Sequence, residues 1–301
     1  MNRRSSAALR NRALRANWPA LAARYHFGTR AVPYVHGEEA AAYDAYLIHR
    51  ARVESPPLPF KPHPGGGIAL PRATHSGPLP EVLLSRRTWR GFGTRAISRR
   101  ALGSLLDLTY GCHMTGIRQG VRVMFRTFPS GGGCHPIEAY VLALRVEGVR
   151  PGLYHYASKT RRLHLIKRGA TPELAAGYLA DQPWFGGAGA LVFMTAIMPR
   201  VWWRYPHPRS YRTVLLEAGH ACQTFCLVAT WLRLAPFCTN ALDDERVERD
   251  LGIDGTNEIL LYAAGVGTRP ADGRWVQWPG HRPDIELPDS RRKRGRARHV
   301  R

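Results

Sequence analysis

Helical periodicity is strongest between residues 211 and 234, where few helix breakers occur. Apolar side chains recur there at intervals of three or four residues, which places them on one face of a helix. They are Leu215, Ala218, Cys222, Cys226, Ala229 and Leu232. The segment therefore predicts a long central helix. Gly219 costs about 1 kcal/mol relative to Ala inside such a helix, so we expect it to mark close packing or a ligand.

Shorter helices are predicted on both sides of an arginine-rich segment. One begins at Pro78 and runs to about residue 85, and the next is capped by Ser98 and ends before Gly111. The apolar face of the second helix consists of Leu102, Leu105, Leu106 and Leu108. Further helical patterns cover residues 37–52 and 243–251.

Strand patterns alternate irregularly with these helices. Residues 137–146 and 190–196 are nearly continuous apolar runs and predict buried strands. Residues 152–156 and 162–166 form a predicted hairpin, and residues 258–264 a last strand. Because helices and strands follow no βαβα repeat, the sequence predicts an α+β fold.

The composition divides these elements into a globular region and two flanks. The chain has 301 residues, of which 44% are hydrophobic, and its longest apolar stretch, residues 186–198, is shorter than a membrane span. Residues 55–80 are rich in Pro and Gly. We predict an N-terminal extension and arm over 1–80, a folded domain over 81–270 and a basic tail over 271–301.

Charge and cysteines narrow the class of protein. The net charge of +22 is concentrated in arginines near both ends, which is typical of solvated tails, although such a surface could also attract nucleic acid. The 5 cysteines form no C-x-x-C pair. We therefore expect a reduced, cytoplasmic protein. Cys222 and Cys226 share a helical face, but without a second ligand pair we predict no metal site.

Three segments could carry chemistry. Residues 86–90 place three guanidinium groups and a hydroxyl close together, as phosphate binding requires, although a solvated arginine face has the same pattern. Residues 129–133 form a glycine loop that lets a ligand approach the backbone, or a flexible turn. Residues 203–212, continuing into Glu217 and His220, concentrate titratable groups or form a helix entry with aromatic residues. Arg204 beside Tyr205 would favour the phenolate of that tyrosine.

In this order the segments resemble the nitroreductase-like flavoproteins, and specifically the SagB-type dehydrogenases of peptide maturation. The resemblance covers about residues 21–268. It rests on RYHFGT (24–29), SRRTWRGF (85–92), FPSGGGCHPIEAYV (128–141), GLYHY (152–156), SYRTVLLEAGHACQTFCLVA (210–229) and GVG (265–267). It implies a homodimer with a central mixed or antiparallel sheet flanked by helices, and FMN at the subunit interface.

The resemblance also implies roles for individual residues. Arg86, Arg87, Thr88 and Arg90 would hold the FMN phosphate and ribityl chain, with Arg269 as a further phosphate ligand. The flavin ring would lie against Pro129, Ser130, Gly131 and Gln223. In the azole-forming members a Lys-Tyr pair assists proton removal, and here Arg204-Tyr205 stands at that position. Because an arginine remains protonated, we expect Tyr205 to act as the base, with His207 as its rival.

The expected activity is the FMN-dependent oxidation of thiazoline or oxazoline rings to azoles in a ribosomal precursor peptide, as in bacteriocin biosynthesis. The precursor peptide and cyclodehydratase proteins would be its partners. Two alternatives remain at this point. One is an NAD(P)H-dependent nitro or quinone reductase, and the other is a basic binding protein without enzymatic activity.

Overall fold

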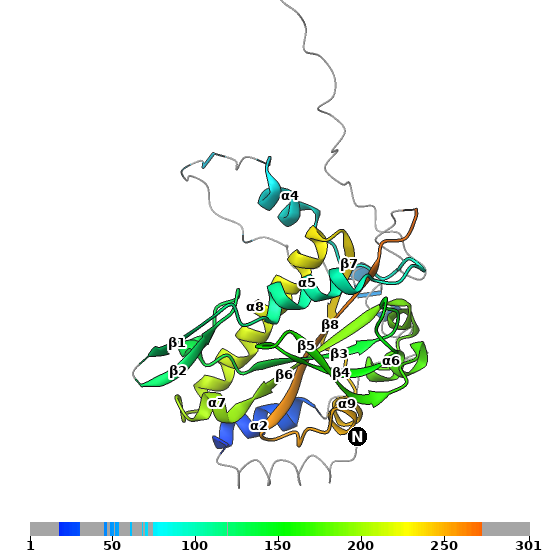
Figure 1. The fold of residues 1–301 in the computed structure, drawn as a ribbon. Coiled ribbons are helices and arrows are strands. Elements are labelled where there is room, and N and C mark those ends of the chain that lie inside the picture. The colour runs from blue at the N-terminus through cyan, green and yellow to red at the C-terminus, as the bar shows by residue number, and fades with distance from the viewer. Residues whose placement is uncertain are drawn as a thin grey trace, which may run out of the picture.

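The computed structural model describes residues 18–30, 75–118 and 120–272, with short pieces between 45 and 71. Predictions for most of the 37–52 helix, most of the 55–80 arm and the tail beyond residue 272 lie outside this part. The helices are α2 (Ala20–Thr29), α4 (Pro78–Ser85), α5 (Arg99–Tyr110), α6 (Pro172–Tyr178), α7 (Met198–Trp202), α8 (Arg209–Trp231) and α9 (Asp244–Leu251) (Figure 1). The strands are β1 (Met114–Arg118), β2 (Val121–Phe125), β3 (Ile137–Ala143), β4 (Gly152–Ala157), β5 (Arg162–Arg168), β6 (Ala190–Ile197), β7 (Leu234–Thr239) and β8 (Glu258–Thr268).

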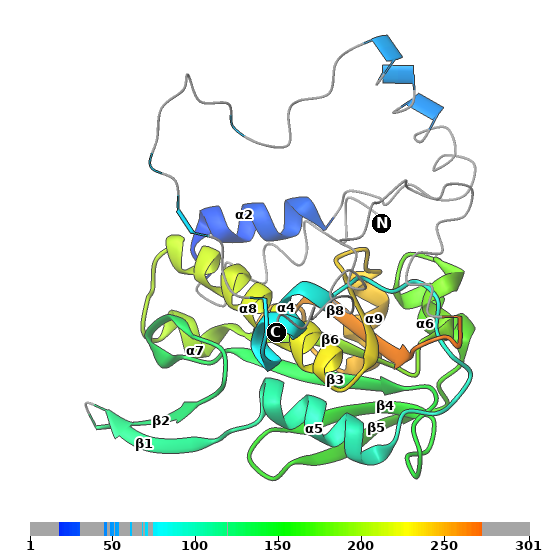
Figure 2. The same cartoon turned by 90° about the horizontal axis from the view of Figure 1, so that it is seen from above.

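A six-stranded sheet in the order β5-β4-β3-β6-β8-β7 forms the centre of the molecule. Neighbouring strands in it are antiparallel throughout. β3, near the middle, is buried at every position, as its apolar sequence requires. The α+β prediction is confirmed. A separate hairpin, β1-β2, projects from one side (Figures 1 and 2).

The two faces of the sheet carry different helices. Val141 and Val192 are paired across β3 and β6 and belong to the core that contains the apolar sides of α5 and α8. Leu142 and Phe193 belong to the core that contains α6 and α9. Successive side chains of a strand point to opposite faces, so one apolar run fills both layers. α2 packs on the α8 side (Figure 2).

α8 begins and ends two to three residues earlier than predicted, because Leu234 already opens β7. Its 23 residues extend about 35 Å. Gly219 lies on the exposed side of α8, and a Cβ atom added there would meet no atom within 4 Å. Within the described part of one chain, Gly219 therefore does not mark close packing, and its alternative role beside a ligand stays a prediction.

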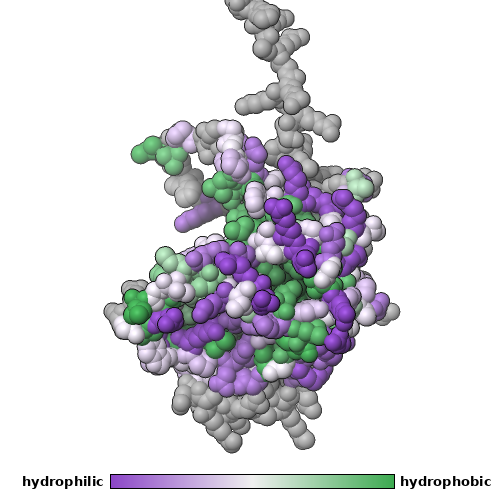
Figure 3. Space-filling model, viewed as in Figure 1, coloured by the Kyte–Doolittle hydropathy of each residue, from purple (hydrophilic) through white to green (hydrophobic). Residues whose placement is uncertain are grey.

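α4 stands away from the sheet. None of its residues is buried, and its leucines Leu79, Leu83 and Leu84 are 64%, 49% and 51% exposed. Figure 3 shows apolar surface on this projecting part of the molecule. No helix among the described residues is long and apolar enough to span a bilayer.

Candidate active site

The glycine loop connects β2 to β3 through a short 3-10 turn at Gly131–Gly133. Gly132 and Gly133 have φ angles of 64° and 67°, a left-handed conformation that favours glycine. Ser130, just before the turn, has an extended backbone. The three glycines therefore allow a tight turn that other residues would strain.

The predicted catalytic residues lie directly against this loop. A Cβ atom added at Gly132 would be 2.4 Å from the Tyr205 hydroxyl oxygen and 2.9 Å from Arg204 Nε. The guanidinium carbon of Arg204 is 5.9 Å from the centroid of the Tyr205 ring. Segments more than 70 positions apart in the sequence thus meet, because the loop between α7 and α8 folds over the glycine turn.

His207 lies in the same α7–α8 loop. Its backbone N–H donates to the carbonyl of Tyr205 at 2.8 Å, and the two ring centroids are 6.1 Å apart. The His207 side chain is exposed, whereas that of Tyr205 is half-buried. The structure therefore brings Arg204, Tyr205 and His207 together beside the loop, and their roles stay predictions.

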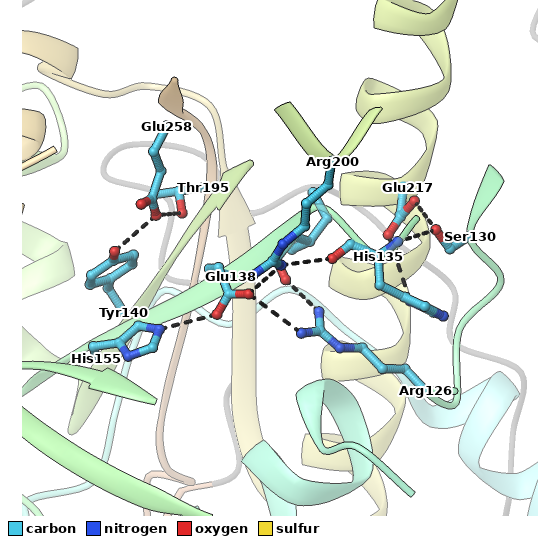
Figure 4. A network of polar contacts seen from close by, with 11 residues as sticks. Arg126, Ser130, His135, Glu138, Tyr140, His155, Thr195, Arg200, Glu217 and Glu258 are labelled. Carbon is cyan, nitrogen blue, oxygen red and sulfur yellow. Dashed lines mark hydrogen bonds and ion pairs between the residues drawn. The ribbon is translucent and has the colours of Figure 1, made fainter. Parts of the chain in front are cut away.

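Glu217 of α8 is hydrogen-bonded to the loop through Ser130 (Figure 4). The Ser130 hydroxyl donates to Glu217 Oε2 at 2.6 Å and accepts from the backbone N–H of His135 at 2.8 Å. The glutamate is 2% exposed. Burial raises its pKa to about 7, although the Ser130 hydrogen bond and the Arg126 charge oppose this shift. A carboxyl group that can gain or lose a proton near neutral pH thus lies beneath the loop.

A second buried carboxylate, Glu138 of β3, continues the network (Figure 4). Arg200 donates to Glu138 Oε1 at 2.6 Å, and His155 Nε2 lies 3.1 Å from Oε2. Arg126 Nη2 is 3.8 Å from the same carboxylate. Burial alone would raise the pKa of Glu138, but the hydrogen bonds from His155 and Arg200 and the arginine charges lower it below its ordinary value. Glu138 is therefore an ionised, structural partner.

Beside the loop, His135 and Glu217 each have one buried polar atom without a hydrogen-bond partner among the described residues. His135 adopts a positive φ of 43°, and its Nδ1 is 3.9 Å from Glu217 Oε1. Both atoms are buried without a hydrogen-bond partner in the described part of the chain. Burial lowers the pKa of His135 to about 4, and the charges of Arg126 and Arg200 add to this effect. The histidine is therefore neutral at pH 7.

The arginine segment lies near the other end of α8. The Trp89 N–H donates to the Pro236 carbonyl of β7 at 2.9 Å, which fixes the segment to the sheet. Arg269 lies beside it, with its guanidinium carbon 5.4 Å from the Trp89 ring, and it donates to the carbonyls of Leu234 and Thr230. The structure thus brings Arg269, 179 positions after Arg90, close to the arginine segment, and its role as a phosphate ligand stays a prediction.

Partly buried positive charge collects at this end. Burial lowers the pKa of Arg90 and of Arg269, and the neighbouring charge of Arg233 adds to the effect at Arg269. The guanidinium carbon of Arg90 is 5.7 Å from the Trp184 ring. A partly buried cation favours a bound anion, and each of these two guanidinium groups is partly buried.

The remaining predicted ligands differ in placement. Arg87 Nη1 donates to the carbonyls of Leu84 and Arg86, so this arginine is tied to the end of α4. Thr88 is half-buried within the same segment, and Gln223 is exposed on α8 between the two ends. From Glu217 to Thr230, α8 rises about 20 Å. Within one chain, the glycine loop and the arginine segment therefore contact different parts of α8, and we call these two regions the half-sites.

Comparisons with known proteins agree with this fold. The sequence profile of the nitroreductase family matches residues 83–268. A Methanocaldococcus jannaschii protein described as a nitroreductase is 30% identical over 192 residues, which cover 64% of this chain and 91% of that protein. The trifolitoxin-processing protein TfxB of Rhizobium leguminosarum bv. trifolii is 32% identical over 142 residues, 46% of this chain and 38% of TfxB.

A solved structure extends the similarity beyond the profile. One chain of the E. coli microcin synthetase McbBCD complex, solved with truncated pro-MccB17 bound, has a TM-score of 0.58. It is 20% identical, and the match covers 89% of this chain and 94% of that chain. At this identity the match establishes a shared fold. With the profile spanning more than half of its residues, the chain belongs to the nitroreductase family.

Proposed function

We propose that the protein is an FMN-dependent, SagB-type dehydrogenase that oxidises azoline rings to azoles in a ribosomal precursor peptide. The observation that carries the proposal is the contact of Arg204 and Tyr205 with the glycine loop at Gly132. This contact places a phenol at the backbone turn expected to line the flavin ring. Similarity to TfxB, and the fold shared with a chain of the microcin synthetase complex, support a precursor peptide and cyclodehydratase proteins as partners.

The residues at both half-sites fit FMN. The partly buried guanidinium groups of Arg90 and Arg269 favour a phosphate. Arg86 belongs to the same segment as Arg90. At the other half-site, the left-handed glycines expose the backbone of the turn, over the buried polar atoms of Glu217 and His135. When bound, FMN supplies a two-electron acceptor for hydride.

A homodimer would join the two half-sites. The glycine loop and the arginine segment are about 20 Å apart along α8, so a second copy is needed to bring one loop to the other copy's arginines. The exposed apolar side chains support this arrangement. They are Leu79, Leu83 and Leu84 of α4 and Leu215, Leu216 and Trp231 of α8. Exposed large apolar side chains of this kind are typical of interfaces between chains.

In the proposed reaction, the azoline ring loses a proton to the protein, and FMN, held by the residues of both half-sites, would accept the hydride. Tyr205 Oη takes the proton, and the guanidinium carbon of Arg204 lies 5.9 Å from the centroid of its ring. Arg204 itself stays protonated, as guanidinium groups do.

Two variants test the base. We expect Tyr205→Phe to abolish azoline oxidation while the protein keeps its yellow colour and FMN content. His207→Ala should retain most of the activity. The opposite pattern, oxidation that survives in the phenylalanine variant and is lost in the alanine variant, would assign the base to His207. Before either assay, a colourless protein that cannot be reconstituted with FMN would refute flavin chemistry and favour a basic binding protein.

An NAD(P)H-dependent nitro or quinone reductase is the second candidate. Arg204 in place of the usual Lys favours it, as does the similarity to the M. jannaschii protein over 91% of that protein's length. The two functions differ in hydride source. Bleaching of the flavin by NADPH without any peptide would identify a reductase, whereas bleaching only by an azoline peptide would identify the dehydrogenase.

A further inference from the structure

Three of the five cysteines converge between α8 and β7. Cys222 and Cys226 are one helical turn apart on the buried face of α8, and Cys238 comes from β7, which packs against that helix. Their Sγ atoms all lie within 4.8 Å of one another. The sequence spacing of the first two predicts a shared face, but only the fold adds the third sulfur.

The cluster is largely buried. Cys222 and Cys226 are 3% and 4% exposed, and Cys238 is half-buried. Three sulfur atoms within 4.8 Å of one another therefore form a preassembled set of soft ligand atoms.

A buried phenol borders the same cluster. Tyr110 of α5 is 1% exposed, and its oxygen has no hydrogen-bond partner in the part of the chain that the structure describes. Besides burial, the charges of Cys222 and Cys226 raise its pKa, so the phenol lies within electrostatic range of these sulfurs. A buried polar atom without a partner costs free energy unless a bound group satisfies it.

We propose that Cys222, Cys226 and Cys238 bind a thiophilic d10 cation, namely Zn²⁺. Zinc–sulfur bonds of about 2.3 Å place three coplanar sulfur ligands about 4 Å apart, so the observed separations need little adjustment. No histidine or carboxylate joins this group among the described residues, which disfavours hard cations that prefer oxygen. The fourth position of the ion is left without a protein ligand from the cluster.

Charge balance favours the divalent ion. Three metal-bound thiolates carry a charge of −3, so Zn²⁺ would leave −1 at the buried site, whereas Cu⁺ would leave −2. The ion would also join α8 to β7, and β7 holds the arginine segment through the Pro236 carbonyl. A bound ion would therefore hold together the two elements that support the arginine segment.

The test uses the full-length protein after reduction and removal of metal by a chelator. Titration with Cd²⁺ as the probe should give a thiolate-to-metal absorption band that saturates at one ion per chain, and Zn²⁺ should displace it. Zinc should protect Cys238, the half-buried member of the cluster, from alkylation, as measured by mass spectrometry, while Cys112 stays reactive. Cys238→Ala should weaken binding by more than the roughly 10- to 100-fold that loss of an outer-shell partner costs. Cys112→Ala, outside the cluster, is the matched control and should bind as the unmodified protein does.

Several results would overturn the proposal. They are a thiol cluster that takes up neither ion, zinc that does not protect Cys238, binding of Cu⁺ but not Zn²⁺, or a disulfide within the cluster in protein purified without reductant. Alkylation of the unmodified protein decides the question even if Cys238→Ala fails to fold. Because these readouts require neither flavin nor peptide, they are independent of the proposed dehydrogenase activity.

Discussion

Replacement of Glu217 by glutamine tests whether a titrating carboxyl group lies beneath the glycine loop. Burial raises the pKa of Glu217 from 4.5 to about 7. That difference corresponds to about 3 kcal/mol, because one pKa unit is worth about 1.4 kcal/mol. The folded protein therefore binds this proton more tightly than the unfolded chain. The stabilisation is fully present below pH 4.5, and it is lost as the pH rises through about 7.

Glutamine keeps the size of the side chain and cannot ionise. We therefore expect Glu217→Gln to gain stability relative to the unmodified protein as the pH rises from 5 to 8, by up to about 3 kcal/mol. Urea unfolding at several pH values measures both proteins in the same state of flavin loading. The difference between their free energies of unfolding removes the contributions of other groups. One of these is His135, whose lowered pKa makes the protein more stable as the pH rises.

Glu147→Gln, at an exposed glutamate, is the control and should leave the pH dependence unchanged. A difference curve for Glu217→Gln that is flat from pH 5 to 8 would refute the reasoning. Glu217 would then be ionised over this whole pH range, stabilised by the Ser130 hydrogen bond and the Arg126 charge, and would not bind a proton near neutral pH.

Three further predictions concern the loop, the arginine segment and the proposed dimer. Gly132→Ala should lower the free energy of unfolding in urea by about 1–3 kcal/mol, because alanine is strained in the left-handed conformation and its Cβ would meet Tyr205. Gly219→Ala should raise the free energy of unfolding by about 0.5–1 kcal/mol. Arg90→Gln should weaken FMN binding, measured by fluorescence titration, by about 2 kcal/mol or roughly 30-fold, and exposed Arg162→Gln should not; equal affinities would exclude Arg90 from the phosphate site. Leu83→Glu should convert a dimer to a monomer in sedimentation experiments, and an unchanged mass would place the interface elsewhere.

Elements with local signals could be predicted from the sequence. α5 was predictable because Ser98 caps it, with its hydroxyl accepting from the Ala101 N–H, and because its apolar spacing is helical. The buried strands β3 and β6 were predictable from unbroken apolar runs, although β3 ends at Ala143, three residues early. These signals depend on neighbouring residues alone, so no tertiary information was needed.

β7 could not be predicted, because Pro236 lies in its middle. A proline lacks the N–H that a strand needs, which argues against a strand in a single sequence. β7 lies at the edge of the sheet and pairs only with β8, so the missing donor is tolerated there. The cysteine cluster was missed for the same reason, because Cys238 belongs to this strand.

The residues of the candidate site divide in the same way. The glycine loop and the Arg204-Tyr205 pair could be picked out from motifs, and the fold brings them together. Glu217 and Glu138 were not predicted as site residues. Each interrupts an apolar pattern, Glu217 on the buried face of α8 and Glu138 within β3. A charged residue in such a position must have a buried partner, and this signal could have identified both.

α8 connects all the features argued above. Its first half carries Glu217 beneath the glycine loop, its middle carries Cys222 and Cys226, and the Thr230 carbonyl near its end accepts from Arg269. A helix of this length is stiff, so the spacing between the two half-sites is fixed by the backbone rather than by flexible side chains. A dimer that aligns one loop with a partner's arginines must therefore match α8 of both chains, which makes the exposed α8 leucines and Trp231 part of the geometry that a shared flavin site requires.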